Sequence, residues 1–291
     1  MILRDVRKNK IESFFIVSIF MLVVMVGTYY VCLYFDFGPF SAIIALVFAA
    51  ITSFASYYNS DKIILSLNGA RPATEEQDKL LSTVLDNLCI ASGLPRPKLY
   101  VIEDSAPNAF ATGRNPEHAV ICVTTGLLDK MNKYELEGVI AHELAHIRNY
   151  DILLSTVVTV FVGFVVILSD SLSRFAFNHS RDSESKSSGI VAIVAIIFLI
   201  LSPIFATLMQ LAISRKREFL ADSTAIEFTR NPDGLRSALI KLTEDKEPLE
   251  AANKSTAHMY IVNPLKGKDL AGLFSTHPPL EKRIERLNNI Q

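Results

Sequence analysis

The residues with the clearest chemical potential lie at positions 139–146, which read Val-Ile-Ala-His-Glu-Leu-Ala-His. In a helix, side chains four residues apart share one face, so His142 and His146 would project together. Two imidazoles placed in this way can hold one Zn²⁺ from the same side. Glu143, beside the first histidine, can act on water as a general base. The flanking residues are good helix formers with apolar side chains at helical spacing, so a helix is predicted here.

A third ligand is needed, because catalytic zinc usually has three protein ligands and an open fourth position. The candidate is Glu218, which begins the stretch Glu-Phe-Leu-Ala-Asp at residues 218–222. Asp222 lies one helical turn further on and could accept a hydrogen bond from the second ring nitrogen of a ligating histidine. The alternative is an exposed helix with solvated charges, which the basic residues just before Glu218 would fit.

The composition indicates a membrane protein. The chain has 291 residues, of which half are hydrophobic and 20% are charged, and its mean hydropathy is +0.30. A net charge of −1 gives no reason to expect a nucleic-acid partner. The three cysteines are dispersed and show no metal-binding spacing, which argues against a disulfide framework and fits a reducing compartment.

Four apolar runs predict four transmembrane helices. They cover residues 14–35, 40–58, 152–169 and 190–213 and would span about 33, 28, 27 and 36 Å as helices. The first run is too long for a signal peptide, lacks a cleavage site and is followed at once by the second run. The third run is close to the lower limit for crossing a bilayer, so a buried core helix is its alternative.

The charges around these runs predict a cytoplasmic active site. Basic residues precede the first run and follow the second and fourth runs, namely Arg4, Arg7, Lys8, Lys10, Lys62, Arg71, Arg215, Lys216 and Arg217. Four spans would put all of them on one side, which the positive-inside rule makes cytoplasmic. An antiparallel pair of helices within residues 152–213 would also bring the two histidines and Glu218 together at that membrane surface. This convergence supports Glu218 as the third ligand.

The expected fold class is α+β and mostly helical, with a catalytic domain in two parts. The expected order is a membrane hairpin at residues 1–58, a first catalytic part at 59–151, a second hairpin at 152–213 and a second catalytic part at 214–291. Strands are predicted at 98–103, 108–113 and 119–125, and a helix is predicted to begin at Thr74.

Two further stretches are candidates for substrate contact. An exposed strand edge near a peptidase cleft can pair with an extended substrate, and the stretch from Asn108 to Thr112 is the candidate, with Asn108, Ala109 and Phe110 as its contact residues; an ordinary edge strand is the alternative. His277 precedes Pro278-Pro279, where it could point into the cleft and stabilise an oxyanion, although a purely structural role is the alternative.

The motifs together resemble those of the HtpX family of membrane zinc endopeptidases. The resemblance rests on His142-Glu-Leu-Ala-His146, Arg217-Glu-Phe-Leu-Ala-Asp222 and Ser275-Thr-His-Pro-Pro279, and on the order of the apolar runs over nearly the whole chain. It implies a zincin-like core, one Zn²⁺ per chain on His142, His146 and Glu218, and Glu143 as the base. It also implies stress-related quality control of damaged or misfolded membrane proteins in a bacterial inner membrane.

Two other functions stay open. In the wider family, which includes the CAAX prenyl proteases, the histidine matching His277 and the edge strand matching Asn108 line the substrate cleft, which the resemblance therefore implies for both here. A prenyl-protein protease is one alternative function. A catalytically silent membrane scaffold with a structural zinc is the other. A structural zinc site is normally closed by four protein ligands, and the sequence offers no convincing fourth. The partners expected from the resemblance are the lipid bilayer and unfolded or membrane-embedded polypeptides.

Overall fold

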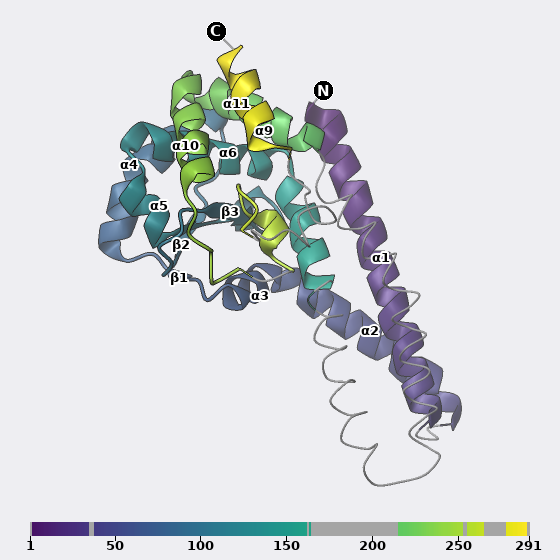
Figure 1. Ribbon diagram of the computed structural model, residues 1–291. Coiled ribbons are helices and arrows are strands. Elements are labelled where there is room, and N and C mark those ends of the chain that lie inside the picture. Colours follow the sequence, from purple (N-terminus) through teal and green to yellow (C-terminus); the bar gives the residue numbers. More distant parts are fainter. Residues whose placement is uncertain are drawn as a thin grey trace.

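The structure, a computed structural model, describes residues 2–34, 38–161, 163, 215–252, 255–264 and 278–289 (Figure 1). It is mostly helical with one small sheet, as predicted. The fourth predicted span, His277 and all but the start of the third span lie outside the described residues. The described start of the third span is the apolar helix Asp151–Phe161.

Two long helices extend away from the folded domain in Figure 1, as the first two apolar runs predict. They are α1 (Ile2–Tyr34) and α2 (Ser41–Tyr58), and each contains a segment long and apolar enough to cross a membrane. The buried residues of α2 recur every fourth position and are all small: Ser41, Ala45, Ala49 and Ser53. Small residues at this spacing allow two helices to approach closely within a bilayer.

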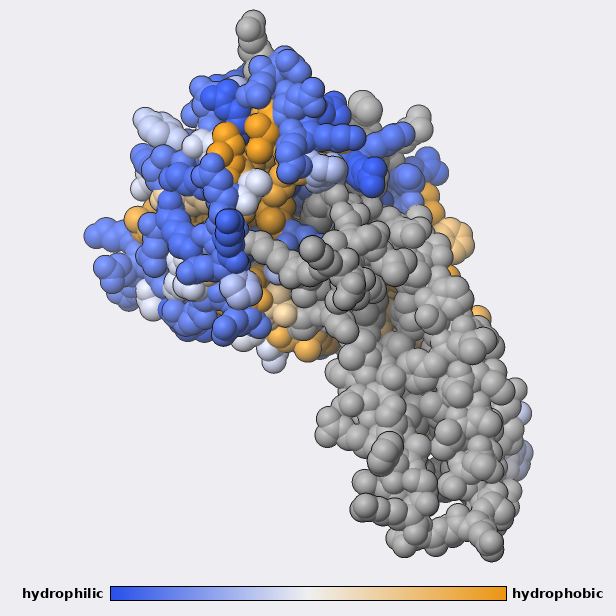
Figure 2. Space-filling model, viewed as in Figure 1, coloured by the Kyte–Doolittle hydropathy of each residue, from blue (hydrophilic) through white to orange (hydrophobic). Residues whose placement is uncertain are grey.

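The outward faces of these helices are apolar. Large hydrophobic side chains such as Phe14, Phe15, Phe48 and Phe54 are between 49% and 69% exposed. Apolar residues are visible along the outer edge of α1 in Figure 2, whereas the folded domain presents a mostly hydrophilic surface. Large apolar side chains exposed along two long helices are typical of contact with lipid or a partner.

The sheet has four strands in the order β1-β2-β4-β3. The strands are β1 (Arg71–Pro72), β2 (Lys98–Ile102), β3 (Ala109–Thr112) and β4 (Val120–Thr124). β2 and β4 are parallel, and the other two pairs are antiparallel. The three predicted strands are therefore present, and β3 lies at one edge of the sheet.

The helix that carries the two histidines, α6 (Lys133–Arg148), lies at the centre of the domain. It packs against β3, α4 (Glu75–Ser92), α9 (Arg215–Thr229) and α10 (Pro232–Glu244). Two glycines let α6 and α10 approach each other. A Cβ atom on Gly138 would lie 2.5 Å from the Leu235 nitrogen, and one on Gly234 would lie 2.5 Å from the Tyr134 oxygen. The close approach fixes the position of α6 against α10.

The start of α6 is anchored by Glu135. Its side chain accepts a hydrogen bond from the Asn132 backbone in a capping box, and it also accepts from Ser237 and Lys241 of α10 at 2.7 Å each. Burial alone would raise the pKa of Glu135, but the hydrogen bonds from Lys241, Ser237 and Asn132 outweigh burial and lower it. The ionised carboxylate therefore stabilises the folded state.

Replacing Glu135 with Gln is expected to lower the free energy of unfolding by about 1.5–3 kcal/mol at pH 7, because hydrogen bonds to a charged group are lost. A carboxylate whose folded pKa is depressed stabilises above its unfolded pKa of about 4.3, and this stabilisation is lost as the pH falls through the lower folded value. The stability gap between wild type and Glu135→Gln should therefore shrink below about pH 4. Unfolding of both metal-free proteins in detergent from pH 7 to pH 3 measures the gap, and a constant gap would contradict this account.

Candidate metal centre

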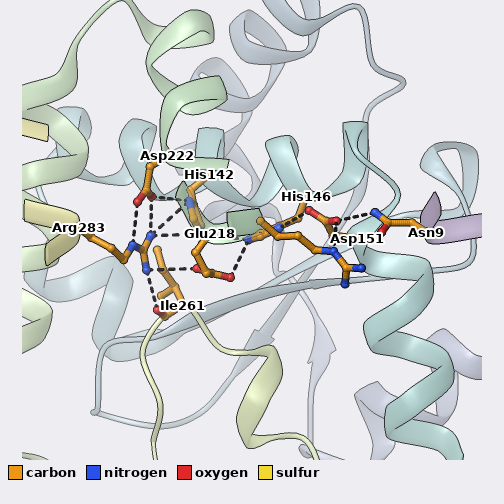
Figure 3. A network of polar contacts seen from close by, with 9 residues as sticks. Asn9, His142, His146, Asp151, Glu218, Asp222, Ile261 and Arg283 are labelled. Carbon is orange, nitrogen blue, oxygen red and sulfur yellow. Dashed lines mark hydrogen bonds and ion pairs between the residues drawn. The ribbon is translucent and has the colours of Figure 1, made fainter. Parts of the chain in front are cut away.

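Three side chains from two helices converge at one point (Figure 3). His142 and His146 project from one face of α6, and Glu218 reaches them from the first turn of α9. The Nε2 atoms of the two histidines are 3.2 Å apart, and each lies 3.6 Å from a carboxylate oxygen of Glu218. The ligand atoms of all three residues lie within 4.8 Å of one another. The structure thus brings together the three residues that the sequence singled out.

The outer ring nitrogen of each histidine contacts a buried carboxylate. His142 Nδ1 lies 3.0 Å from Asp222 Oδ1, and His146 Nδ1 lies 3.0 Å from Asp151 Oδ2. Each contact places the ring proton on Nδ1, so the lone pair is on Nε2 and faces the centre. Asp222 was predicted in this role, whereas Asp151 was not.

The chemistry of these donors fits a divalent cation. Two Nε2 lone pairs and a carboxylate that face one another at these distances repel unless a proton or a metal ion lies between them. Burial alone would lower the pKa of His146, but Asp151, Glu218 and Glu143 outweigh burial and raise it to about 9. The centre therefore attracts positive charge, and two nitrogens with one carboxylate oxygen is a donor set that Zn²⁺ uses at catalytic sites.

Glu143 lies beside this centre. It follows His142 on α6 and is 2% exposed. Burial raises the pKa of Glu143, and the neighbouring His142 and His146 partly oppose that effect. A desolvated carboxylate next to three metal donors is suited to exchanging a proton with water or substrate rather than to forming a surface ion pair.

Arg283 is a buried cation at the centre that the sequence analysis did not identify. It lies on α11 (Leu280–Asn288) and is fully buried. Its guanidinium donates two hydrogen bonds to Asp222, at 2.9 and 2.7 Å, and one of its nitrogens lies 3.5 Å from Glu218 (Figure 3). It also donates to the Ile261 carbonyl at 3.2 Å. The bidentate contact orients Asp222, which in turn orients His142.

Both unpredicted residues leave a signal in the sequence. Arg283 lies on the face of α11 that packs against the core, together with Leu280, Ile284 and Leu287. It is therefore a charged residue on an otherwise apolar helix face. Asp151 comes three positions after the end of α6 and is the first residue of the apolar helix Asp151–Phe161, so it is a carboxylate that begins a buried segment. A buried charge needs an oppositely charged or hydrogen-bonding partner, so a charged residue at such a position indicates a buried polar contact.

The N-terminal helix also reaches the metal centre. Asn9 of α1 is 2% exposed, and its Nδ2 donates to Asp151 Oδ1 at 2.7 Å and to the Asn149 carbonyl at 2.9 Å. Arg217 of α9 lies 3.6 Å from Asp151 and 2.7 Å from Glu12 of α1. The polar start of α1 is therefore attached to the carboxylate that holds His146.

The predicted substrate-contact residues lie at the sheet edge but are already engaged. The Asn108 side chain donates to the Val262 carbonyl at 2.9 Å, and the Ala109 carbonyl accepts from the Ile261 nitrogen at 2.9 Å. Phe110 is fully buried and packs edge-on against Tyr260. His277 lies outside the described residues, so its predicted role stays a prediction.

Replacing Arg283 with Met is expected to destabilise the metal-free protein by about 3–5 kcal/mol, because Asp222 loses its buried counter-charge. The matched control is Arg286→Met on the same helix, an exposed residue whose guanidinium lies 4.2 Å from the Phe219 ring. The control should cost about 1 kcal/mol or less. Thermal unfolding of the three proteins in detergent and chelator measures both losses. Equal stability of the two variants would show that Arg283 does not compensate the buried carboxylates.

Comparison with known proteins places the chain in a family, and matches to related sequences and to a solved structure accompany it. A model of peptidase family M48 matches residues 75–291. A protein described as "Protease HtpX homolog" from Dictyoglomus thermophilum is 46% identical over 282 residues, which cover 97% of this chain and 92% of that protein. One of the same description from Listeria monocytogenes serotype 4a is 42% identical, and the match covers 100% of both chains. The crystal structure of S. mikatae Ste24p has a similar fold, with a TM-score of 0.51 at 19% identity over 98% of this chain and 67% of that one.

Proposed function

This chain belongs to peptidase family M48 and is a metallopeptidase, and on that premise we propose that it is a membrane-integrated, zinc-dependent endopeptidase. The observation that carries the proposal is the convergence of His142, His146 and Glu218 within 4.8 Å beside the buried Glu143. In this proposal the three residues hold one Zn²⁺, and Asp222 and Asp151 keep the two imidazoles in the ligating tautomer.

The catalytic role is assigned to Glu143. When bound by His142, His146 and Glu218, Zn²⁺ would supply Lewis-acid chemistry for the scissile carbonyl and for water. Glu143 takes the proton from the attacking water and then delivers a proton to the leaving amine. Arg283 holds Asp222 in place, and His277 is proposed to stabilise the oxyanion or position substrate. No fourth protein ligand joins the three donors among the described residues, which favours a catalytic site over a structural one.

The outer edge of β3 supports a short contact with an extended substrate. The Asn108 carbonyl accepts from Thr124 of β4, so residues 109, 111 and 113 direct their backbone groups away from the sheet. Ala109 is bonded to Ile261, and the Gly113 nitrogen donates to Thr156 at 3.2 Å. Ala111 lies between these two covered positions. We therefore narrow the pairing site from the stretch Asn108 to Thr112 to the backbone of Ala111.

The protein's insertion in a membrane and its topology form the next part of the proposal. The two apolar helices α1 and α2, together with the similarity to proteins described as HtpX homologues, support a membrane protein. We propose four spans, with membrane hairpins at residues 1–58 and 152–213 and a catalytic domain formed by 59–151 and 214–291. The positive-inside rule puts the active site on the cytoplasmic side of a bacterial inner membrane, where its substrates would be damaged or misfolded membrane proteins.

A prenyl-protein protease is the second candidate, favoured by the fold shared with S. mikatae Ste24p. The two functions differ in substrate. Purified zinc-loaded protein in detergent is offered an unfolded membrane protein and, separately, a peptide with a prenylated C-terminal cysteine. We expect internal cleavage of the membrane protein, with the prenylated peptide left intact. If only the prenylated peptide were cleaved, the protein would be a prenyl-protein protease instead.

A further inference from the structure

A cavity of about 600 Å³ lies where the two long helices meet the folded domain. The described residues in its walls come from α1, α2, the loop after β3 and the segment that follows α6, and none of these residues belongs to the metal centre. The volume is within the range of about 300–1,000 Å³ that is usual for small-molecule sites. The described residues that line it are Lys10, Ser13, Phe14, Val17, Ser53, Phe54, Tyr57, Arg114, Asn115, Tyr150 and Leu153.

The charged part of the lining is cationic. Lys10 and Arg114 line the cavity, and its described lining includes no carboxylate. Lys10 Nζ lies 4.2 Å from the centre of the Tyr150 ring, and the Arg114 guanidinium lies 5.1 Å from that of Tyr58. Neither cation forms a salt bridge with any residue in the described part of the chain. Two cations near aromatic rings, with no counter-charge, are complementary to an anion.

Two buried hydroxyl groups point to the same kind of ligand. Ser13 and Ser53 line the cavity from α1 and α2, and their side chains are only 3% and 8% exposed. Within the described ranges neither hydroxyl has a hydrogen-bond partner. A buried donor without a partner costs free energy, so a ligand oxygen in the cavity would remove that cost.

The remainder of the lining is apolar and continues along the membrane helices. Lys10, Phe14 and Val17 lie on one face of α1, so the lining changes from charged to apolar within about 10 Å. Phe14 and Phe54 are 69% and 64% exposed on the two long helices. The cavity therefore offers cations, then hydroxyl groups and then an apolar surface. This order matches the phosphate, the ester groups and the acyl chains of a phospholipid.

We infer that this cavity binds the headgroup of one anionic phospholipid. Lys10 and Arg114 contact its phosphate, Ser13 and Ser53 donate to its ester oxygens, and its acyl chains lie against Phe14 and Phe54. The site is separate from the proposed peptide hydrolysis and needs only that α1 and α2 lie in the membrane. Interfacial tyrosines such as Tyr57 and Tyr150 are common at headgroup level.

The site adjoins the residues that support the metal centre. Tyr150 has a φ of +59°, a strained backbone conformation for a residue other than glycine. Its neighbours Asn149 and Asp151 both accept hydrogen bonds from Asn9, which directly precedes Lys10. A headgroup that holds Lys10 against Tyr150 would therefore stabilise the attachment of α1 to the carboxylate that orients His146.

The test measures lipid adducts of the full-length, zinc-loaded protein in detergent by native mass spectrometry. Phosphatidylglycerol and phosphatidylcholine with the same acyl chains are titrated separately. We expect one phosphatidylglycerol per chain, bound roughly tenfold or more tighter than phosphatidylcholine, because each basic contact favours an anionic lipid. Equal affinity of the wild type for the two lipids would overturn the inference without the use of any variant.

A pair of double variants locates the site. Lys10→Gln with Arg114→Gln should remove most of the preference, whereas Lys8→Gln with Lys62→Gln makes the same charge change outside the cavity and should keep it. If both double variants lost the preference for phosphatidylglycerol equally, general charge attraction would explain the preference, and the inference would be contradicted. Inorganic phosphate in excess should not displace the lipid, and displacement would mean that the cavity takes a free anion instead.

Discussion

Replacing Glu143 with Gln is expected to abolish peptide cleavage while the protein keeps one zinc per chain. Gln has nearly the same shape as Glu, so the buried position stays filled, but the amide cannot accept the proton from water. General acid–base catalysis contributes about 10²–10⁴-fold to rate, and cleavage should fall by at least that factor. Because Glu143 is not among the three converging ligands, zinc content should not change.

The measurement compares zinc content and the cleavage rate of an unfolded polypeptide for wild type, Glu143→Gln and Glu137→Gln. Glu137 is a carboxylate on the same helix, partly exposed and without an assigned role, so its variant should behave as the wild type. Full activity in Glu143→Gln would remove Glu143 as the base. Loss of zinc in that variant would instead make Glu143 part of the binding site.

Replacing Glu218 with Gln is expected to weaken zinc binding by at least about 100-fold. The change removes the one anionic donor of the three-ligand set, and even residues that only support metal ligands alter affinity by 10–100-fold. The effect should appear in competition with a chelator of known affinity, and cleavage should fall with zinc occupancy.

The matched control is Glu227→Gln on the same helix. Glu227 is 54% exposed and pairs with Arg148 at 3.4 Å, so its loss should change zinc affinity little. Since Glu218 also lies 3.5 Å from Arg283, both variants are first checked for unfolding temperature in chelator. Unchanged zinc affinity in a well-folded Glu218→Gln would exclude Glu218 from the ligand set.

Local patterns predicted the secondary structure around the centre well. The apolar and β-branched runs predicted β2 and β4, and Thr74 begins α4 with a capping box at the predicted helix start. His142 and His146 lie four residues apart on one helix, so a correct helix prediction was enough to place both rings on the same face. Glu218 could be predicted because an antiparallel pair of helices within residues 152–213 would return the chain to the side of the two histidines. The resemblance to the HtpX family is confirmed by the comparisons.

The residues that support the centre could not be predicted, because they depend on tertiary contacts between distant segments. Arg283 contacts Asp222 across 61 positions of the sequence, and Asn9 contacts Asp151 across 142. No local periodicity links such pairs. The coverage of β3 by Ile261 and Thr156 also depends on packing, so the sequence indicated an edge strand but not which of its residues remain for a substrate.

In the proposed function, peptide cleavage requires one metal ion at the His142, His146 and Glu218 site. The most direct test is the cleavage rate of the wild-type protein before zinc removal by a chelator, after removal, and after return of zinc in measured steps. We expect activity to disappear with the metal and to return in full at one zinc per chain. Undiminished cleavage by the metal-free protein would contradict it.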